Sequence, residues 1–172
     1  MRKIFILITI LLIILLSYNY FPYSPIPQGI EVDKLIVDKS ERKLMVYSNG
    51  SVIKTFSIAL GDNPNGHKER EGDEKTPEGD YIIDSKAGLG ASGYHKNLGV
   101  SYPNKTDIAN ARKNGFSPGG EIKIHGLKNG LDFIGKIQSW RDWTNGCMAV
   151  TNDEIDDLYK HVKIGTPITI KP

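Results

Sequence analysis

The only cysteine of this 172-residue chain, Cys147, stands in the stretch DWTNGCMAV, residues 142–150. A lone cysteine is either a small buried hydrophobe or a reactive thiol. Thr144, Asn145 and Gly146 are typical of a turn and an apolar run follows, so we expect the thiol at a turn-to-strand junction. Successive backbone N–H groups can converge there on a developing negative charge, and Gly146 permits an unusual φ or close approach of a substrate. The setting suits a nucleophile but leaves a buried structural cysteine open.

A cysteine nucleophile needs a base, and the chain has four histidines. His161 is expected on the polar face of a C-terminal helix, and His67 in an exposed charged loop. His95 follows flexible glycines and is expected in a loop near a cleft. His125 ends an apolar strand and Gly126 follows it, so the ring is expected at the rim of a sheet, within reach of a substrate. A satisfied core or rim histidine is the alternative.

The N-terminus predicts where the protein is located. Arg2 and Lys3 precede Ile4–Leu16, which is almost wholly apolar, and this layout is typical of a signal anchor or a signal peptide. The positive-inside rule places the N-terminus in the cytoplasm and the rest outside. Because no small-residue cleavage site follows, an uncleaved anchor is favoured. We therefore expect a membrane segment over residues 1–21, membrane contact through residues 4–21, and a location at the extracytoplasmic face of the cytoplasmic membrane or in the periplasm.

The rest of the chain is expected to form a linker and one domain. The Pro-rich residues 22–30 predict a stiff linker that leads away from the membrane. Residues 31–172 are long enough for one domain with a hydrophobic core. Two of the 22 Lys and Arg residues precede the apolar segment and all 20 Asp and Glu residues follow it, so the domain is close to neutral, which argues against a nucleic-acid partner. Thiols outside the cytoplasm usually pair, so an unpaired Cys147 indicates a free reactive thiol or an intermolecular crosslink.

The hydrophobic pattern predicts a mostly β domain with one or two helices. Strands are expected over residues 32–37, 43–48, 52–60, 80–84, 98–102, 121–125 and 168–170. Asn49-Gly50 predicts a hairpin turn that completes three antiparallel strands. A short helix is expected over residues 107–113, and another after Thr151, which forms a capping-box pattern with Glu154. Residues 61–79 predict a polar loop whose charges are solvated.

The sequence IHG at residues 124–126, followed after a spacer by TNGC at residues 144–147, resembles the catalytic domain of the L,D-transpeptidase (YkuD-like) family. That family's signature is His-Gly, a spacer, then Ser/Thr-x-Gly-Cys. Similar stretches appear in the family's order: KTPEGDYII (75–83), YHKNLGVSYPN (94–104) and PGGEIKIHG (118–126). The resemblance implies a mainly β fold, an L,D-transpeptidase-type β-sandwich with one or two helices, over residues 31–172 behind the N-terminal membrane segment.

The resemblance also implies a substrate and a mechanism. Cys147 would attack the carbonyl of the third residue of a peptidoglycan stem peptide and release the terminal D-alanine. His125 would act as base and then as acid, and the carbonyl of Gly126 would orient its ring. The amine of a second stem would resolve the thioester and complete a crosslink, with no metal or organic cofactor. The residues implied in holding the oxyanion or the substrate are Asn145, Gly146, Thr144 and Tyr102.

Two positions depart from the family's pattern. Asn145 stands where the family often has histidine, and Ala149 stands where it often has arginine, so a charge contact to the substrate is missing. Catalysis is expected to survive because His125 matches the family's base. Two alternatives stay open: an L,D-carboxypeptidase or endopeptidase that hydrolyses the same acyl-enzyme, and a wall-binding module with a vestigial site. Trp140 and Trp143 are candidates to line the cleft, with core or rim packing as the alternative.

Overall fold

The computed structural model describes residues 2–19 and 23–172. An eight-stranded sheet organises the domain, in the order β3-β2-β1-β8-β4-β5-β6-β7. Its strands are β1 (Lys34–Asp38), β2 (Lys43–Ser48), β3 (Ser51–Ser57), β4 (Gly79–Ala87), β5 (Asn97–Val100), β6 (Lys123–His125), β7 (Met148–Ala149) and β8 (Pro167–Lys171). The helices are α1 (Arg2–Asn19), α2 (Lys105–Lys113) and α3 (Asn152–His161), and the segment η1 (Asp132–Trp140) is 3₁₀-helical.

The first three strands form the antiparallel meander that the sequence predicts. Asn49 and Gly50 both have positive φ, as expected of a tight hairpin turn. On its other side β1 pairs in parallel with β8, and β8 pairs antiparallel with β4. The last strand of the chain therefore joins the meander to the second half of the sheet, β4-β5-β6-β7.

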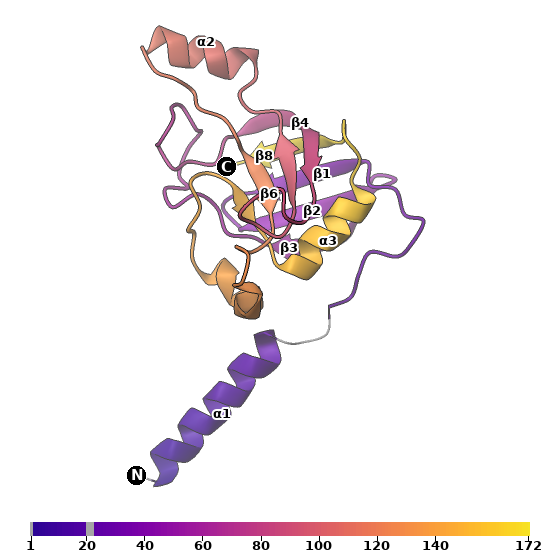
Figure 1. Ribbon diagram of the computed structural model, residues 1–172, viewed down its shortest axis with the longest axis vertical. Helices are drawn as coiled ribbons and strands as arrows, with labels where there is room; N and C mark the ends of the chain where they lie inside the picture. Colours follow the sequence, from indigo (N-terminus) through magenta and orange to yellow (C-terminus); the bar gives the residue numbers. More distant parts are fainter. Residues whose placement is uncertain (1, 20–22) are drawn as a thin grey trace.

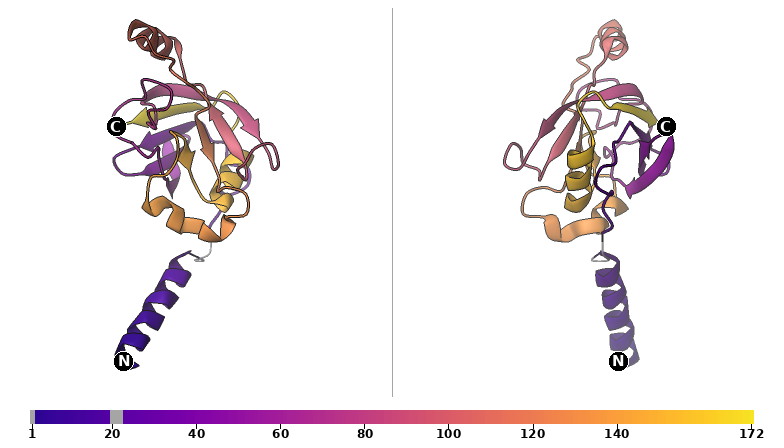
Figure 2. Two further views of the ribbon diagram at one scale, coloured as in Figure 1. Left: turned by 60° about the vertical axis from the view of Figure 1, so that its left-hand side comes forward. Right: turned by 90° about the vertical axis from the view of Figure 1, so that its right-hand side faces the viewer.

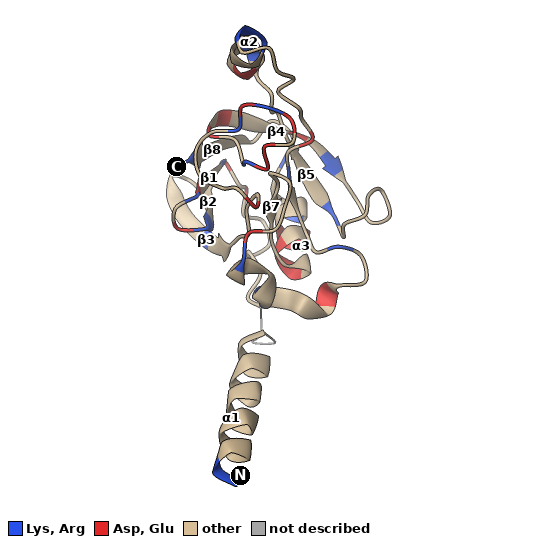
Figure 3. Ribbon diagram, turned by 90° about the vertical axis from the view of Figure 1, so that its left-hand side faces the viewer, with Lys and Arg blue, Asp and Glu red and all other residues tan. Residues whose placement is uncertain are grey.

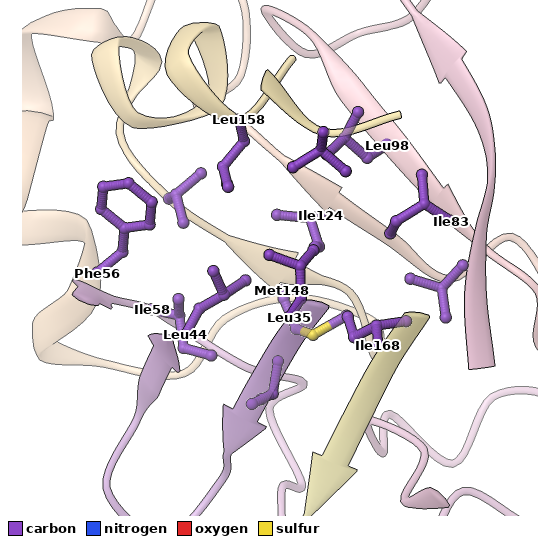
Figure 4. Close-up of a cluster of buried hydrophobic side chains, with 14 of the residues drawn as sticks. Leu35, Leu44, Phe56, Ile58, Ile83, Leu98, Ile124, Met148, Leu158 and Ile168 are labelled. Atoms are coloured by element: carbon purple, nitrogen blue, oxygen red, sulfur yellow. The ribbon is translucent and has the colours of Figure 1, made fainter. Parts of the chain in front are cut away.

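The sheet curls until its two ends meet (Figure 1). Ala59, two residues after β3, exchanges two backbone hydrogen bonds with Ala149 of β7, at 3.0 and 2.8 Å. Side chains from both halves fill the interior in one cluster that α3 covers (Figure 4). Complete burial of one such Leu or Ile side chain contributes ~1.5–3 kcal/mol. The mainly β prediction is confirmed, as one curled sheet whose halves face each other across a single core. Fully buried members include Leu35, Leu44, Leu98, Ile124, Met148 and Leu158.

The two predicted helices of the domain are present, and a third segment was not predicted. α3 follows the predicted capping box: Thr151 N–H donates to Glu154 at 2.8 Å, and Glu154 N–H donates to the Thr151 hydroxyl at 3.4 Å. α2 begins two residues before the predicted start because the Asn104 side chain caps it. η1 lies in the spacer before Cys147 and is interrupted by Gly135, whose φ is 51°.

The N-terminal helix α1 projects away from the domain (Figures 1 and 2). None of its described residues is buried in the protein, and it is long and apolar enough to cross a membrane. Residues 1, 20 and 21 of the predicted membrane segment and residue 22 of the predicted linker lie outside the described residues.

The described part of the predicted linker packs on the domain, contrary to the expectation that it leads away. The Tyr23 hydroxyl and the Ile26 N–H both donate to Asp157 Oδ2 of α3, each at 2.6 Å. Ile26 is buried, and the Tyr23 ring stacks on Phe56 with centroids 6.5 Å apart. Both residues stand between the prolines, and the burial of Ile26 and the partial burial of the Tyr23 ring outweigh the tendency of a Pro-rich segment to stay extended in solvent.

The charged loop over residues 61–79 is partly buried, so the expectation of a solvated surface is wrong here. Lys68 and Asp73 form an ion pair at 2.7 Å with both side chains almost wholly buried. His67 is half-buried rather than exposed, and its Nδ1 accepts the N–H of Glu78 at 3.0 Å. Figure 3 shows the acidic and basic segments of this loop interleaved beside β7.

Candidate active site

The register of two neighbouring strands brings Cys147 and His125 to one face of the sheet. β6 and β7 pair in parallel, with Ile124 opposite Met148 and His125 opposite Ala149. Ile124 and Met148 point into the core and are fully buried (Figure 4). Since side chains alternate along a strand, His125 and Cys147 face the other way.

Both side chains line one pocket of about 330 Å³. The turn before Cys147 and β6 form part of its wall, and the loop before β5 forms another part. The lining residues that carry polar or aromatic groups include Tyr94, Asn97, Lys123, His125, Thr144, Asn145 and Cys147.

His125 is oriented by the carbonyl of the next residue. Its Nδ1 lies 2.7 Å from the Gly126 carbonyl oxygen, and because a carbonyl can only accept, Nδ1 carries the proton and Nε2 has the free lone pair. Burial lowers the pKa of His125 to about 4, although the Gly126 bond opposes that change. The ring of Tyr94 lies 4.0 Å from the imidazole, and that of Trp143 lies 5.8 Å away, edge-on. His125 is therefore a neutral base held in one tautomer.

The thiol of Cys147 is also uncharged at neutral pH. Burial raises its pKa above the ordinary value, and the nearby Lys123 only partly opposes this. Sγ lies 3.5 Å from the Glu121 carbonyl oxygen, which is the acceptor of the S–H proton. The pKa of Tyr94 is raised by burial and by the proximity of Cys147, so the phenol also remains protonated.

The turn before the cysteine is locked by Thr144. Its hydroxyl donates to the Cys147 carbonyl at 2.7 Å and accepts the Gly146 N–H at 3.1 Å. Gly146 has a φ of 121°, and a Cβ there would lie 2.6 Å from the Lys75 carbonyl oxygen. The sequence suggested three converging N–H groups, but that of Gly146 already binds Thr144, which leaves those of Asn145 and Cys147 as candidates for an oxyanion.

Gly126 is required by close packing against α3. A Cβ at this position would lie 2.8 Å from Ile155 Cγ2 and 2.9 Å from Asn152 Oδ1. Asn152 Oδ1 also accepts the Leu127 N–H at 2.9 Å. The start of α3 thus holds the backbone that orients the His125 ring, a role for Asn152 that the sequence did not reveal.

Tyr102, which the resemblance implied in substrate binding, does not line the pocket. It is buried, and its hydroxyl donates to the Pro118 carbonyl at 3.0 Å. His95 lies outside the pocket, with Nε2 2.8 Å from Asp156. His161 is buried and does not lie on an exposed polar face. Its Nδ1 lies 2.9 Å from the Asp157 carbonyl oxygen, one turn earlier in α3, so the buried ring has a hydrogen-bond partner.

Several pocket residues were missed by the sequence reasoning. Lys123 precedes His125 by two residues on the same strand, so strand alternation could have identified it. Tyr94 gave no local signal, since its contact with His125 depends on how the loop before β5 folds back. Of the two spacer tryptophans, Trp143 contacts His125 while Trp140 is exposed outside the pocket.

No group of three His, Cys, Asp or Glu side chains that could hold a metal ion occurs among residues 2–19 and 23–172.

Known proteins are similar to this chain in sequence or in fold. YqjB of Bacillus subtilis (strain 168), named "Putative L,D-transpeptidase YqjB", is 27% identical over 139 residues, 79% of this chain and 69% of that protein. The helical cell shape determining protein Pgp2 of Campylobacter jejuni has a similar fold, with 22% identity and a TM-score of 0.60 over 91% of this chain and 53% of that one. An L,D-transpeptidase of Xylanimonas cellulosilytica also has this fold, with 17% identity and a TM-score of 0.54 over 87% of this chain.

The chain spans 69% of the Bacillus protein, but 53% and 65% of the two solved chains, which are longer. The sequence model of one protein family matches nearly the whole domain, from β1 to β8. Because this match to the L,D-transpeptidase catalytic domain (YkuD) extends over residues 33–170, the chain belongs to the L,D-transpeptidase family.

Proposed function

We propose that this domain forms a thioester between Cys147 and the third residue of a peptidoglycan stem peptide, releases the terminal D-alanine, and passes the acyl group to an amine. The observation that carries the proposal is the His125 ring: its Nδ1–H is bound to the Gly126 carbonyl, which leaves Nε2 as the basic nitrogen, and His125 lines the same pocket as Cys147. Membership of the L,D-transpeptidase family supports the same substrate class.

The acylation step moves one proton twice. As Cys147 Sγ bonds to the substrate carbonyl carbon, the thiol proton passes to His125 Nε2 and the carbonyl oxygen becomes an oxyanion. The N–H groups of Asn145 and Cys147 stabilise that charge. When the tetrahedral species collapses, the C–N bond breaks and Nε2 returns the proton to the departing amine of D-alanine. An amine acceptor then attacks the thioester by the same steps in reverse.

Lys123 provides the positive charge that Ala149 lacks. The two positions lie on neighbouring strands, and Lys123 shares the outer face of β6 with His125. Its ammonium pairs with Glu121 at 2.6 Å, and that carboxylate is 86% exposed, so a substrate carboxylate can replace it at little cost. We assign Lys123 to the recognition of a stem-peptide carboxylate.

The apolar helix α1 and the membership of the L,D-transpeptidase family support a proposal about where the protein is located in the cell. We propose that residues 1–21 anchor the protein in the cytoplasmic membrane and that residues 31–172 act on its extracytoplasmic face, where peptidoglycan lies. The similarity to the cell shape determining protein of Campylobacter jejuni makes cell-wall remodelling for cell shape part of the proposal.

The test incubates the detergent-solubilised full chain with a tetrapeptide muropeptide and an amine acceptor and records the products by mass spectrometry. We expect loss of D-alanine, a covalent adduct on Cys147, and crosslinked dimers. Tripeptides without dimers would assign the protein to the hydrolases instead, and intact substrate would favour a wall-binding module with a vestigial site.

Three variants assign the roles. Cys147→Ala removes the adduct, and His125→Gln slows acylation by ~10²–10⁴-fold, the usual contribution of a general base. His95→Ala is the matched control, because its ring contacts Asp156 outside the pocket. An acylation rate unchanged in His125→Gln would remove that residue from the mechanism.

A further inference from the structure

η1 and the residue before it expose large apolar side chains that the catalytic pocket does not use. We call Leu131, Phe133, Ile137 and Trp140 the η1 patch. Phe133 is 62% exposed and Trp140 is 59% exposed. Single exposed apolar residues are common, but several on one short segment mark a surface with a partner.

The η1 patch lies where α1 leaves the domain. The Tyr18 and Trp140 rings have centroids 6.2 Å apart, and the Asn19 side-chain amide donates to the Phe133 carbonyl at 3.1 Å. Both views of Figure 2 show η1 at the end of the domain that faces α1, with α2 at the opposite end. The patch therefore continues the lipid-facing surface of α1.

The chain between helix and domain is too short to separate them. Tyr23 and Ile26 are held on Asp157 of α3. Tyr23 lies four positions along the chain from Asn19, the last residue of α1. A fully extended chain of four residues reaches at most ~14 Å. The domain therefore cannot stand away from the bilayer that α1 crosses.

We propose that the η1 patch inserts into the interfacial region of the lipid bilayer and seats the catalytic domain on the membrane. The proposal rests on the membrane location of α1 proposed above. Tryptophan and tyrosine favour this region, where their rings sit at headgroup level, and segments of this kind bury their apolar side chains ~5–10 Å deep.

Contact between the η1 patch and the membrane would determine which peptidoglycan strands can reach the pocket. Trp143 follows Trp140 by three residues, and its ring lies 5.8 Å from His125. The pocket is thus connected directly to the membrane-facing segment, and its substrates are stem peptides on the wall or precursor strands nearest the bilayer.

The test reconstitutes the full chain in vesicles whose phospholipids carry bromine near the top of the acyl chains, since bromine quenches tryptophan on contact. The chain has two tryptophans, so Trp143→Phe leaves Trp140 as the reporter and Trp140→Phe leaves Trp143. We expect Trp140 to lose most of its emission and Trp143 to keep most of its own. In the chain without either tryptophan, Phe116→Trp places a reporter after α2, at the far end, which should remain unquenched. Adding Phe133→Ser to the Trp143→Phe chain should weaken the quenching of Trp140.

The outcomes separate this proposal from the proposed function. Vesicle flotation is measured first, and a full chain that does not float with the vesicles contradicts the membrane anchor itself. A chain that floats with Trp140 unquenched, or with the Phe116→Trp reporter quenched as strongly, overturns the η1 seat and leaves the transpeptidase activity untouched.

Discussion

The thiol and the imidazole of the pocket are both uncharged at rest, which predicts how Cys147 reacts as the pH changes. Burial lowers the pKa of His125 to about 4 and raises the pKa of Cys147 above its ordinary value of 9.0. The two values are at least about five pH units apart, so moving the proton from sulfur to imidazole costs ~7 kcal/mol before the two charges attract. A thiolate–imidazolium pair is therefore a minor species in the free enzyme.

The assay is alkylation by iodoacetamide, which has one target because Cys147 is the only cysteine. Less than about 1% of the thiol is ionised at pH 7, so the rate should rise about tenfold per pH unit up to at least about pH 9. His125→Gln should leave this profile nearly unchanged while it slows acylation by the muropeptide, because the imidazole takes the proton only as the substrate is attacked. A rate that levels off between about pH 5 and pH 8 would refute the reasoning, since it is the mark of a preformed ion pair.

Three further substitutions test the surrounding structure. Gly146→Ala forces a Cβ to 2.6 Å from the Lys75 carbonyl at a φ of 121°, so we expect a loss of roughly 1–3 kcal/mol in unfolding free energy, and an unchanged melting temperature would contradict the strain. Lys123→Met should raise KM for stem peptides by roughly 10–100-fold, which corresponds to the loss of one charge-assisted hydrogen bond. An equal rise in KM for substrates whose carboxylates are amidated would contradict carboxylate recognition by Lys123. Burial raises the pKa of Asp73, but the hydrogen bonds from Lys68 and from three backbone N–H groups outweigh burial and lower it. The charged Asp73 therefore stabilises the folded protein above about pH 4, and this contribution is lost as the pH falls further. Asp73→Asn should therefore lower the free energy of unfolding by ~1–3 kcal/mol at pH 7. Urea unfolding at acid pH checks this, and a difference between variant and wild type that is as large in acid as at pH 7 would contradict it.

Much of the fold could be predicted because its signals are local. The hairpin at Asn49-Gly50 and the capping box of Thr151 and Glu154 depend on neighbours in sequence, and both are present. The linker could not be predicted, because the contact of Tyr23 with Asp157 spans more than a hundred residues. Composition indicated an extended segment and gave no sign of the carboxylate that binds it.

The residues of the site likewise divide into those that short motifs predict and those that depend on contacts distant in sequence. The spacing of the two short motifs indicated Cys147 and His125, and the structure brings both into one pocket. The contact between the Tyr94 ring and the His125 ring depends on the fold of a distant loop, which no short motif encodes. The Gly146 N–H was expected to face the substrate, yet it donates to the Thr144 hydroxyl, and this competition between two acceptors depends on how the turn folds.

The place of β8 in the sheet has a consequence for the order of folding. β8 is the last strand along the chain, but it lies between β1 and β4, so the strand ladder between the meander and the half that carries Cys147 is completed only when residues 167–171 pair with both. A chain that emerges from the ribosome or translocon N-terminus first can form its hairpins early, whereas pairings this distant in sequence form late. The half of the sheet that carries His125 and Cys147 is thus expected to join the meander late in folding, after β6 and β7 have paired with each other.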